Sequence, residues 1–152
     1  MKYPAMKWLN SITIALILVI TLFLVLGMGC NKSPSSPIGL YWFWPSVRPS
    51  RGEYVLLAMP LKQIAGMPGD VVSVTAAGTY VNGRLIPNSA PSATWAHYPY
   101  GTFKLGPDQL WVVGNHPLAY DSRYLGPIPV SLVNAVAEPL ITWPRTHGSR
   151  RN

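Results

Sequence analysis

The sequence contains a single cysteine, Cys30, among 152 residues. One cysteine cannot form an intramolecular disulfide, so packing and hydrogen bonds must hold the fold together even in an oxidising compartment. The preceding Leu-Gly-Met-Gly weakly resembles a lipoprotein box, but Gly27 stands where such boxes carry leucine. The cysteine therefore gives little reason to expect a lipid anchor.

Histidines and acidic residues are also scarce. The three histidines, His97, His116 and His147, are too scattered for a metal motif. Five acids in the whole chain argue against paired-carboxylate chemistry, and no glycine-rich phosphate loop is present. We expect neither a metal nor a cofactor. A serine triad with His116 and Asp121 stays open, because such triads occur in many chain orders.

Positive charge is present without a nucleic-acid motif. The net charge is +7, but lysines and arginines form no stripe with interleaved aromatic residues. We therefore expect no nucleic-acid partner, and attraction to anionic lipid headgroups of the cytoplasmic membrane is the simpler reading.

One long stretch, from Trp8 to Asn31, carries no charged residue. Its apolar part, 12–29, would reach about 27 Å as a helix, enough to cross a bilayer. A cleaved signal peptide is the alternative, but its apolar region is usually shorter, at ~7 to 15 residues. Because this run is longer and Gly-Met-Gly-Cys is a weak cleavage site, we expect a retained anchor, and Lys2 and Lys7 before it favour a cytoplasmic N-terminus. Trp42, Phe43 and Trp44 could then lie at the membrane interface or in a core strand.

The remaining chain has the pattern of a mainly β protein. Runs rich in Val, Ile, Leu, Tyr and Trp predict strands at 40–44, 53–59, 61–65, 71–75, 79–81, 84–87, 109–113 and 130–142. Asn82-Gly83 predicts a type I′ hairpin turn, and 87–106 reads as an irregular insertion. Ser131–Glu138 could be helical instead. The predicted organisation is a cytoplasmic N-terminus and anchor at 1–30, one periplasmic β domain at 31–144 and a basic, disordered tail at 145–152.

Ser35 and Lys62 are the candidates for chemistry. A serine hydroxyl needs a base that accepts its proton, and lysine can serve if burial lowers its pKa from ~10.4. Lys62 has apolar neighbours in sequence, with no acid close to it. Most lone lysines are solvated, so this pattern alone is weak.

Four segments strengthen this reading, because they resemble the TraF-type conjugative transfer signal peptidases, relatives of bacterial type I signal peptidases. Segment 31–41, Asn-Lys-Ser-Pro-Ser-Ser-Pro-Ile-Gly-Leu-Tyr, is similar to their nucleophile segment, and 62–70 to their lysine box. Val-Asn-Gly-Arg-Leu-Ile-Pro-Asn follows at 81–88, and 121–129 resembles the box that closes the site. The resemblance implies a single signal-peptidase-like β domain behind one transmembrane helix.

The resemblance also implies roles for individual residues. Ser35 corresponds to the nucleophile and Lys62 to the general base, with Ser36 as the alternative nucleophile if the register slips by one. Ser33 would help the Ser35 N–H bind the oxyanion. Asp121 and Arg123 would form a supporting ion pair, although a solvated surface pair is the alternative.

Two positions depart from the family pattern. Ala119 stands where relatives carry a serine that orients the lysine, and Gln63 replaces a common arginine. Only 26 residues separate Ser35 from Lys62, which suggests a trimmed substrate-side loop.

The expected function is that of a membrane-anchored serine endopeptidase in the bacterial inner membrane. It would remove leader peptides from exported precursors, with a conjugative pilin precursor as the implied substrate and a cyclic product as one outcome. A non-catalytic β-domain scaffold of a conjugation or secretion apparatus is the alternative, and Ala119 favours it.

Overall fold

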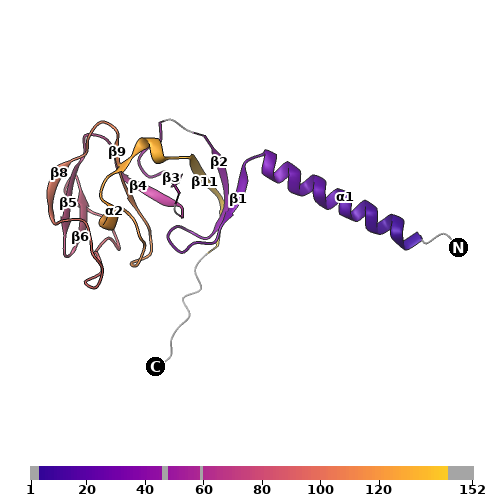
Figure 1. The fold of residues 1–152 in the computed structure, drawn as a ribbon, viewed down its shortest axis with the longest axis horizontal. Helices are drawn as coiled ribbons and strands as arrows, with labels where there is room; N and C mark the ends of the chain where they lie inside the picture. The colour runs from indigo at the N-terminus through magenta and orange to yellow at the C-terminus, as the bar shows by residue number, and fades with distance from the viewer. Residues whose placement is uncertain (1–3, 46–47, 59, 144–152) are drawn as a thin grey trace, which may run out of the picture.

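The protein is described by a computed structural model that covers residues 4–45, 48–58 and 60–143. The predicted tail at 145–152, His147 and the end of the predicted strand at Met59 lie outside these residues. One long helix, α1 (Pro4–Val25), precedes a body made of two antiparallel β-sheets. Figure 1 shows α1 extending from the β1–β2 side of the body, away from β5, β6 and β8. The prediction of a mainly β fold behind one N-terminal apolar helix is confirmed.

The larger sheet has seven strands in the order β1-β2-β11-β3-β4-β9-β10, and every neighbouring pair is antiparallel. Its strands are β1 (Met28–Asn31), β2 (Gly39–Trp44), β11 (Ala135–Thr142), β3 (Tyr54–Leu56), β4 (Lys62–Gly66), β9 (Gln109–Val113) and β10 (Ile128–Pro129). The smaller sheet has the order β7-β6-β5-β8. Its strands are β7 (Arg84–Leu85), β6 (Gly78–Val81), β5 (Val71–Thr75) and β8 (Gly101–Lys104).

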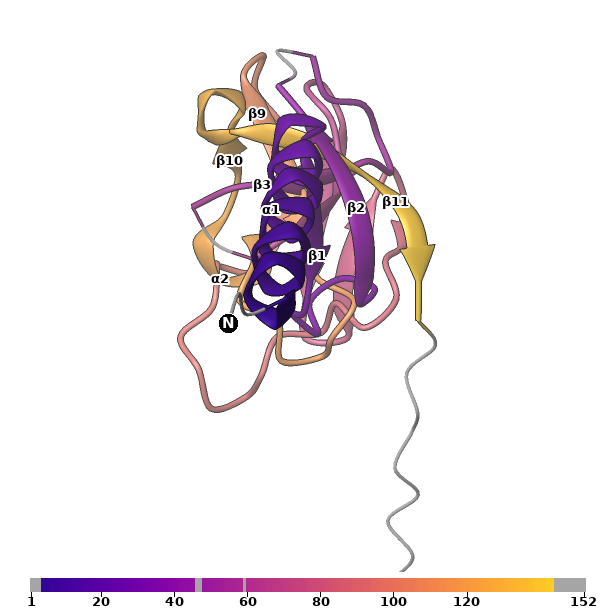
Figure 2. The same ribbon diagram turned by 90° about the vertical axis from the view of Figure 1, so that its right-hand side faces the viewer.

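Helix α1 is exposed where its side chains are described, from Trp8 to Val25. Among the described residues it is the one helix long and apolar enough to cross a membrane. The chain turns at Gly27, whose φ of 67° is a conformation that glycine adopts without strain. Figure 2, viewed from the N-terminal side, shows α1 nearly end-on in front of the sheet that contains β1, β2 and β11.

The sequence did not predict β1, because its residues continue the apolar run of α1. Its pairing with β2, from Met28 opposite Trp42 to Asn31 opposite Gly39, depends on backbone contacts that no local pattern reveals. The insertion at 87–106 is not wholly irregular, since β8 pairs with β5 as an edge strand. The helical alternative for Ser131–Glu138 is wrong beyond a single 3₁₀ turn, Val130–Leu132, because Ala135–Thr142 pairs with both β2 and β3.

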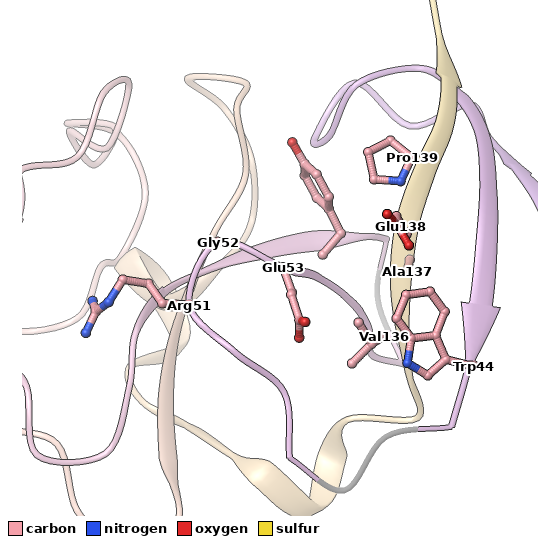
Figure 3. Close-up of a pocket in the computed structure, with 9 residues that line it drawn as sticks. Trp44, Arg51, Gly52, Glu53, Val136, Ala137, Glu138 and Pro139 are labelled. Atoms are coloured by element: carbon pink, nitrogen blue, oxygen red, sulfur yellow. The ribbon is translucent and has the colours of Figure 1, made fainter.

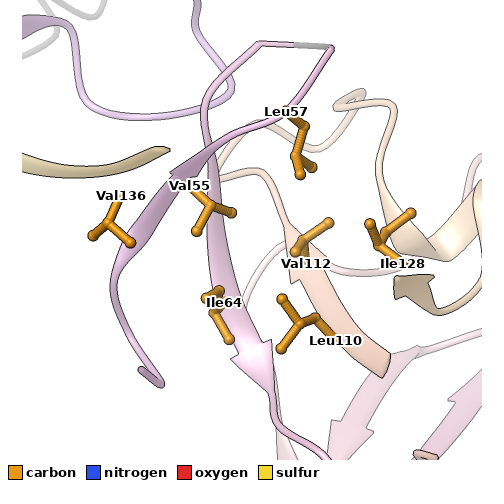
Figure 4. Packing of buried hydrophobic residues seen from close by; sticks show 7 residues of the cluster. All are labelled: Val55, Leu57, Ile64, Leu110, Val112, Ile128 and Val136. Atoms are coloured by element: carbon orange, nitrogen blue, oxygen red, sulfur yellow. The ribbon is translucent and has the colours of Figure 1, made fainter. Parts of the chain in front are cut away.

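Two hydrophobic clusters fill the body. The first lies against β3, β4, β9 and β11 and contains Val55, Leu57, Ile64, Leu110, Val112, Ile128 and Val136 (Figure 4). The second joins the smaller sheet to β9 through Val72, Val74, Val81, Leu105, Trp111 and Val113. Strand β9 therefore contributes alternate side chains to both clusters. The Asn82-Gly83 turn between β6 and β7 has φ values of 50° and 79°, as the type I′ prediction requires.

Short helix α2 (Ser122–Leu125) follows β9 and packs its buried residues into the body. Asp121 is its N-cap and accepts a hydrogen bond from Arg123 N at 3.1 Å. A carboxylate at this position satisfies a helix N–H that has no partner within the helix. The cap therefore fixes Asp121 and Arg123 next to the end of β9.

Candidate active site

The predicted nucleophile, Ser35, lies in the connection between β1 and β2, which we call the nucleophile loop (residues 32–38). Ser35 is 8% exposed. Its carbonyl accepts a hydrogen bond from Asn115 N at 2.6 Å, which fastens the loop to the segment after β9. The loop is thus held against the larger sheet rather than free in solvent.

The neighbouring serines differ in what their hydroxyls do. Ser36 is fully buried, and its hydroxyl donates to the Leu61 carbonyl at 2.7 Å. Ser33 Oγ accepts from Ser35 N at 3.3 Å, so the two predicted oxyanion donors lie side by side. Because the Ser36 hydroxyl already ties the loop to the residue before Lys62, the geometry favours Ser35 over Ser36 as the nucleophile.

Lys62, the first residue of β4, is buried to 1% exposure. It pairs with Val55 and shares a face of the strand with Ile64, so it borders the cluster of Figure 4. Burial lowers the pKa of the Lys62 ammonium; Asp121 opposes this shift and Arg123 adds to it. A lysine with a lowered pKa is easier to deprotonate, which a general base requires.

Gly114, the residue after β9, packs against the predicted nucleophile Ser35. The β4–β9 register pairs Gln63 with Val113, and continuing it by one residue sets Gly114 opposite Lys62. A Cβ added at Gly114 would lie 3.3 Å from Ser35 Cβ and 2.4 Å from Ala119 Cβ. No side chain fits there, so the nucleophile loop can approach the segment after β9 closely. The described residues contain no hydrogen bond between the Ser35 hydroxyl and the Lys62 amine, a contact that often forms only in the substrate complex.

Asp121 and Arg123 form an ion pair with no exposed side-chain area on either partner. Arg123 Nε and Nη2 each donate to the carboxylate at 2.8 Å, and Asp121 Oδ2 also accepts from Gly114 N at 2.7 Å. The guanidinium also donates to the carbonyls of Asn88, Ala90, Pro117 and Gly114. The alternative of a solvated surface pair is wrong, because these carbonyls enclose the charge.

Ala119 occupies the position where relatives carry the lysine-orienting serine. It is buried against Gly114, on the same side as Ser35 Cβ. Its methyl group can neither donate nor accept a hydrogen bond. Ala119 therefore cannot orient the Lys62 amine, and Asp121 and Arg123 lie close enough to influence its charge.

The open alternative of a triad with His116 is not assembled. Both carboxylate oxygens of Asp121 are bound to Arg123, and His116 Nδ1 accepts from Leu118 N at 3.1 Å. A triad histidine needs its Nδ1–H on the aspartate. No group of three or more potential metal ligands occurs within the described ranges.

The three aromatic residues of β2 divide between surface and core. Trp42 is 48% exposed, whereas Phe43 and Trp44 pack against buried clusters. The interface reading therefore fits Trp42, and the core reading fits the other two. A separate hollow of about 490 Å³ lies between residues 51–54 and β11 (Figure 3). Neither Ser35 nor Lys62 lines it.

Two site residues, Asn31 and Asn115, were missed by the sequence reasoning, and a third, Ser36, was named there only as an alternative nucleophile. Asn31 hydrogen-bonds to both sides of the nucleophile loop, Asn115 binds Ser35 O, and Ser36 binds Leu61 O. Asn31 begins the segment that carries the family resemblance, and this was the one available signal. The other two contacts join segments that are distant in sequence.

Comparison with known proteins shows the family of the chain. Residues 5–143 match the family described as signal peptidase, peptidase S26. The chain belongs to this family. The predicted resemblance to its TraF-type members is confirmed.

Relatives named for plasmid transfer cover most of the chain. "Plasmid transfer protein TraF" of Escherichia coli is 28% identical over 77% of this chain and 84% of its own length. "Conjugal transfer protein TraF" of Agrobacterium tumefaciens is 27% identical over the same shares. "Probable signal peptidase I-2" of Synechocystis is 41% identical over 45% of this chain and 32% of its own length. A crystal structure of signal peptidase I from Enterococcus faecalis aligns with 62% of this chain and 97% of that one, at 21% identity and a TM-score of 0.40.

Proposed function

We propose that this protein is a membrane-anchored serine endopeptidase with a Ser35/Lys62 dyad that removes leader peptides from exported precursors. The single observation that carries the proposal is the burial of Lys62, which is 1% exposed and whose pKa is lowered by that burial. A buried lysine whose pKa is lowered is costly to the fold, and such sites are typical of catalytic groups. Membership of the signal peptidase family supports the same reaction.

The proposed mechanism has two halves. Neutral Lys62 takes the Ser35 hydroxyl proton while Oγ attacks the scissile carbonyl. The Ser35 N–H, which donates to Ser33 Oγ in the free protein, turns to the oxyanion, and the Ser33 hydroxyl donates to it as well. Protonated Lys62 then gives its proton to the leaving amine. Water, activated by the same lysine, hydrolyses the acyl-enzyme; attack by an internal amine of the product would instead close a ring.

The membrane supplies the setting. With α1 in the inner membrane and Lys2 and Lys7 on the cytoplasmic side, the β domain lies in the periplasm. The nucleophile loop then lies only a few residues from the bilayer. A precursor's own apolar segment would present its cleavage site there, and its extended backbone could add to the free edge of β1.

The names of the relatives support a conjugative substrate. Proteins named for plasmid or conjugal transfer align with most of this chain, so we propose a pilin precursor as the substrate. Mass spectrometry of the processed partner would identify its new terminus and separate a linear product from a cyclic one.

Co-expression with a candidate precursor tests the proposal. We expect the wild type and Ser36→Ala to retain processing, with Ser36→Ala slowed by the lost Leu61 contact. Ser35→Ala and Lys62→Ala should fall by a factor on the order of 10⁶ in kcat, because a dyad acts as a unit. Equal processing by the wild type and both dyad variants would rule out the mechanism.

A non-catalytic scaffold in a conjugation or secretion apparatus is the second candidate. The observation in its favour is Ala119, which removes the polar group that relatives use to orient the lysine. In that case the wild type would not shorten the precursor, whereas the Ser35→Ala variant would still support assembly of the apparatus.

A further inference from the structure

We infer that Asn31 is a positioning residue of the active site, which holds the nucleophile loop in its reactive shape. The inference rests on the proposed serine endopeptidase function. Asn31 is the last residue of β1 and is 9% exposed. It does not react, and it acts on Ser35 through the loop backbone.

The Asn31 amide uses its N–H donors and its carbonyl oxygen inside the loop. Oδ1 accepts from Ser33 N at 3.0 Å. Nδ2 donates to the carbonyls of Pro37, Ser33 and Ser36 at 2.9, 3.1 and 3.3 Å. A side-chain amide has two N–H donors and one carbonyl acceptor, so three carbonyls share two protons. These partners lie on both sides of Ser35.

The contacts explain how a seven-residue loop keeps one conformation. The loop leaves β1 at Asn31 and enters β2 at Gly39, which pair across the hairpin. Its inward-facing carbonyls need donors, and the amide supplies them. Pro37 O has a second donor in the Tyr41 hydroxyl, at 2.7 Å. Loss of Asn31 would therefore be felt at Ser33 and Ser36, the residues beside the nucleophile.

The effect reaches the reaction through Ser33. Asn31 Oδ1 fixes the Ser33 backbone, and Ser33 Oγ lies 3.3 Å from Ser35 N. A shift of Ser33 would misplace one proposed oxyanion donor without touching the bound peptide. Such a change lowers kcat and leaves KM unchanged, because oxyanion contacts form only in the transition state.

An isosteric substitution isolates this role. Asn31→Asp replaces Nδ2 by an oxygen that faces three carbonyls, so an ionised carboxylate is repelled. Once protonated, the acid regains one donor, and burial among carbonyls raises the pKa of such a group. Asn31→Ala removes the amide without adding a titrating group. Asn134→Asp makes the same charge change at an exposed position and serves as the matched control.

The test measures kcat and KM for the full-length variants in detergent. The probe is a synthetic precursor with a basic segment, an apolar segment and an Ala-x-Ala site. We expect Asn31→Ala to lose roughly 10- to 100-fold in kcat with KM unchanged, somewhat less than the loss of a whole oxyanion donor. The Asn31→Asp to wild-type ratio of kcat should rise as the pH is lowered, while the Asn31→Ala and Asn134→Asp ratios stay flat.

Unchanged kcat in Asn31→Ala, or a defect confined to KM, would overturn the inference, as would a pH-independent Asn31→Asp ratio. Hydrogen exchange of residues 32–38 in Asn31→Ala tests, without an activity assay, whether the Asn31 hydrogen bonds hold the nucleophile loop. Protection equal to that of the wild type would also overturn the inference. Ser35→Ala and Lys62→Ala in the same series test the proposed function separately. If they cleave as fast as the wild type, the function fails even where the exchange result stands.

Discussion

Two charged clusters of the β body differ in their exposure to solvent. In the active-site cluster, Lys62, Asp121 and Arg123 are at most 1% exposed, and each interacts with its neighbours. In the surface cluster, next to the smaller sheet, Asp70 binds Arg51 and Asn82, and the Arg51 side chain remains 47% exposed. Water can replace a lost partner in the second place but not in the first. Losing a charged partner should therefore destabilise the fold far more in the active-site cluster than in the surface cluster.

The largest effect should come from breaking the buried pair. Arg123→Met leaves the Asp121 carboxylate in a dry site and removes the donors to four carbonyls, so we expect the protein to lose about 3 to 5 kcal/mol of unfolding free energy. Urea unfolding measures this. Asp121→Asn combined with Arg123→Met should cost less than the sum of the two single changes. A loss below about 1 kcal/mol would contradict the contrast.

Two glycine-to-alanine substitutions compare the active-site region with the smaller sheet. Gly114→Ala places a methyl group against Ala119 and Ser35, so we expect a loss of about 1 to 3 kcal/mol and slower cleavage. Gly83→Ala, in the β6–β7 turn, meets nothing within 4 Å and bears only the strain of its φ of 79°, about 1 to 2 kcal/mol. Its cleavage rate should match the wild type. Thermal melts and peptide assays on both variants decide this, and a slowed Gly83→Ala would count against the assignment.

Lys62→Met should stabilise the protein, unlike the substitutions above. Burial lowers the pKa of Lys62, so below ~10.5 the unfolded state binds more protons than the folded state. Wild-type stability therefore rises with pH between the lowered pKa and ~10.5. We expect Lys62→Met to be inactive and about 1 kcal/mol more stable at neutral pH, with an advantage that shrinks as pH rises. A variant less stable than the wild type at every pH would show that Lys62 is not strained.

The smallest effect should follow from Arg51→Met. Its ion pair with Asp70 is partly exposed, and Asp70 keeps hydrogen bonds from Met67 N and Asn82. We expect a loss of about 0 to 1 kcal/mol, reduced further at high salt, with no change in cleavage. The same unfolding assay at two salt concentrations checks this. A loss of unfolding free energy as large as that of Arg123→Met would show that the two clusters do not differ.

Local signals in the sequence predicted much of this structure. Asn82-Gly83 specifies its own turn, because both residues tolerate positive φ. The family motifs predicted a signal-peptidase-like β domain behind one apolar helix, and they singled out Ser35 and Lys62 as the candidate residues. Each of these features depends on residues that lie close together in the chain or in a known pattern.

Features that arise from distant contacts were not predictable. Asp121 and Arg123 were expected as a pair, but their burial depends on the carbonyls of Asn88, Ala90 and Pro117. Strands β1 and β8 are edge strands whose backbone pairing, not their side chains, defines them. Asn31 acts through carbonyls, which every residue carries, so its role has no signature in composition.

The joint between α1 and β1 is only two residues long, Leu26 and Gly27, and Phe43 N donates to Gly27 O at 2.7 Å. So short and braced a joint leaves little slack between helix and sheet. With α1 in a bilayer, Ser35 is carried at a nearly constant height above the lipid. The protein would then select the peptide bond that it cleaves by the distance of that bond from the end of an apolar segment, as well as by the residues around it.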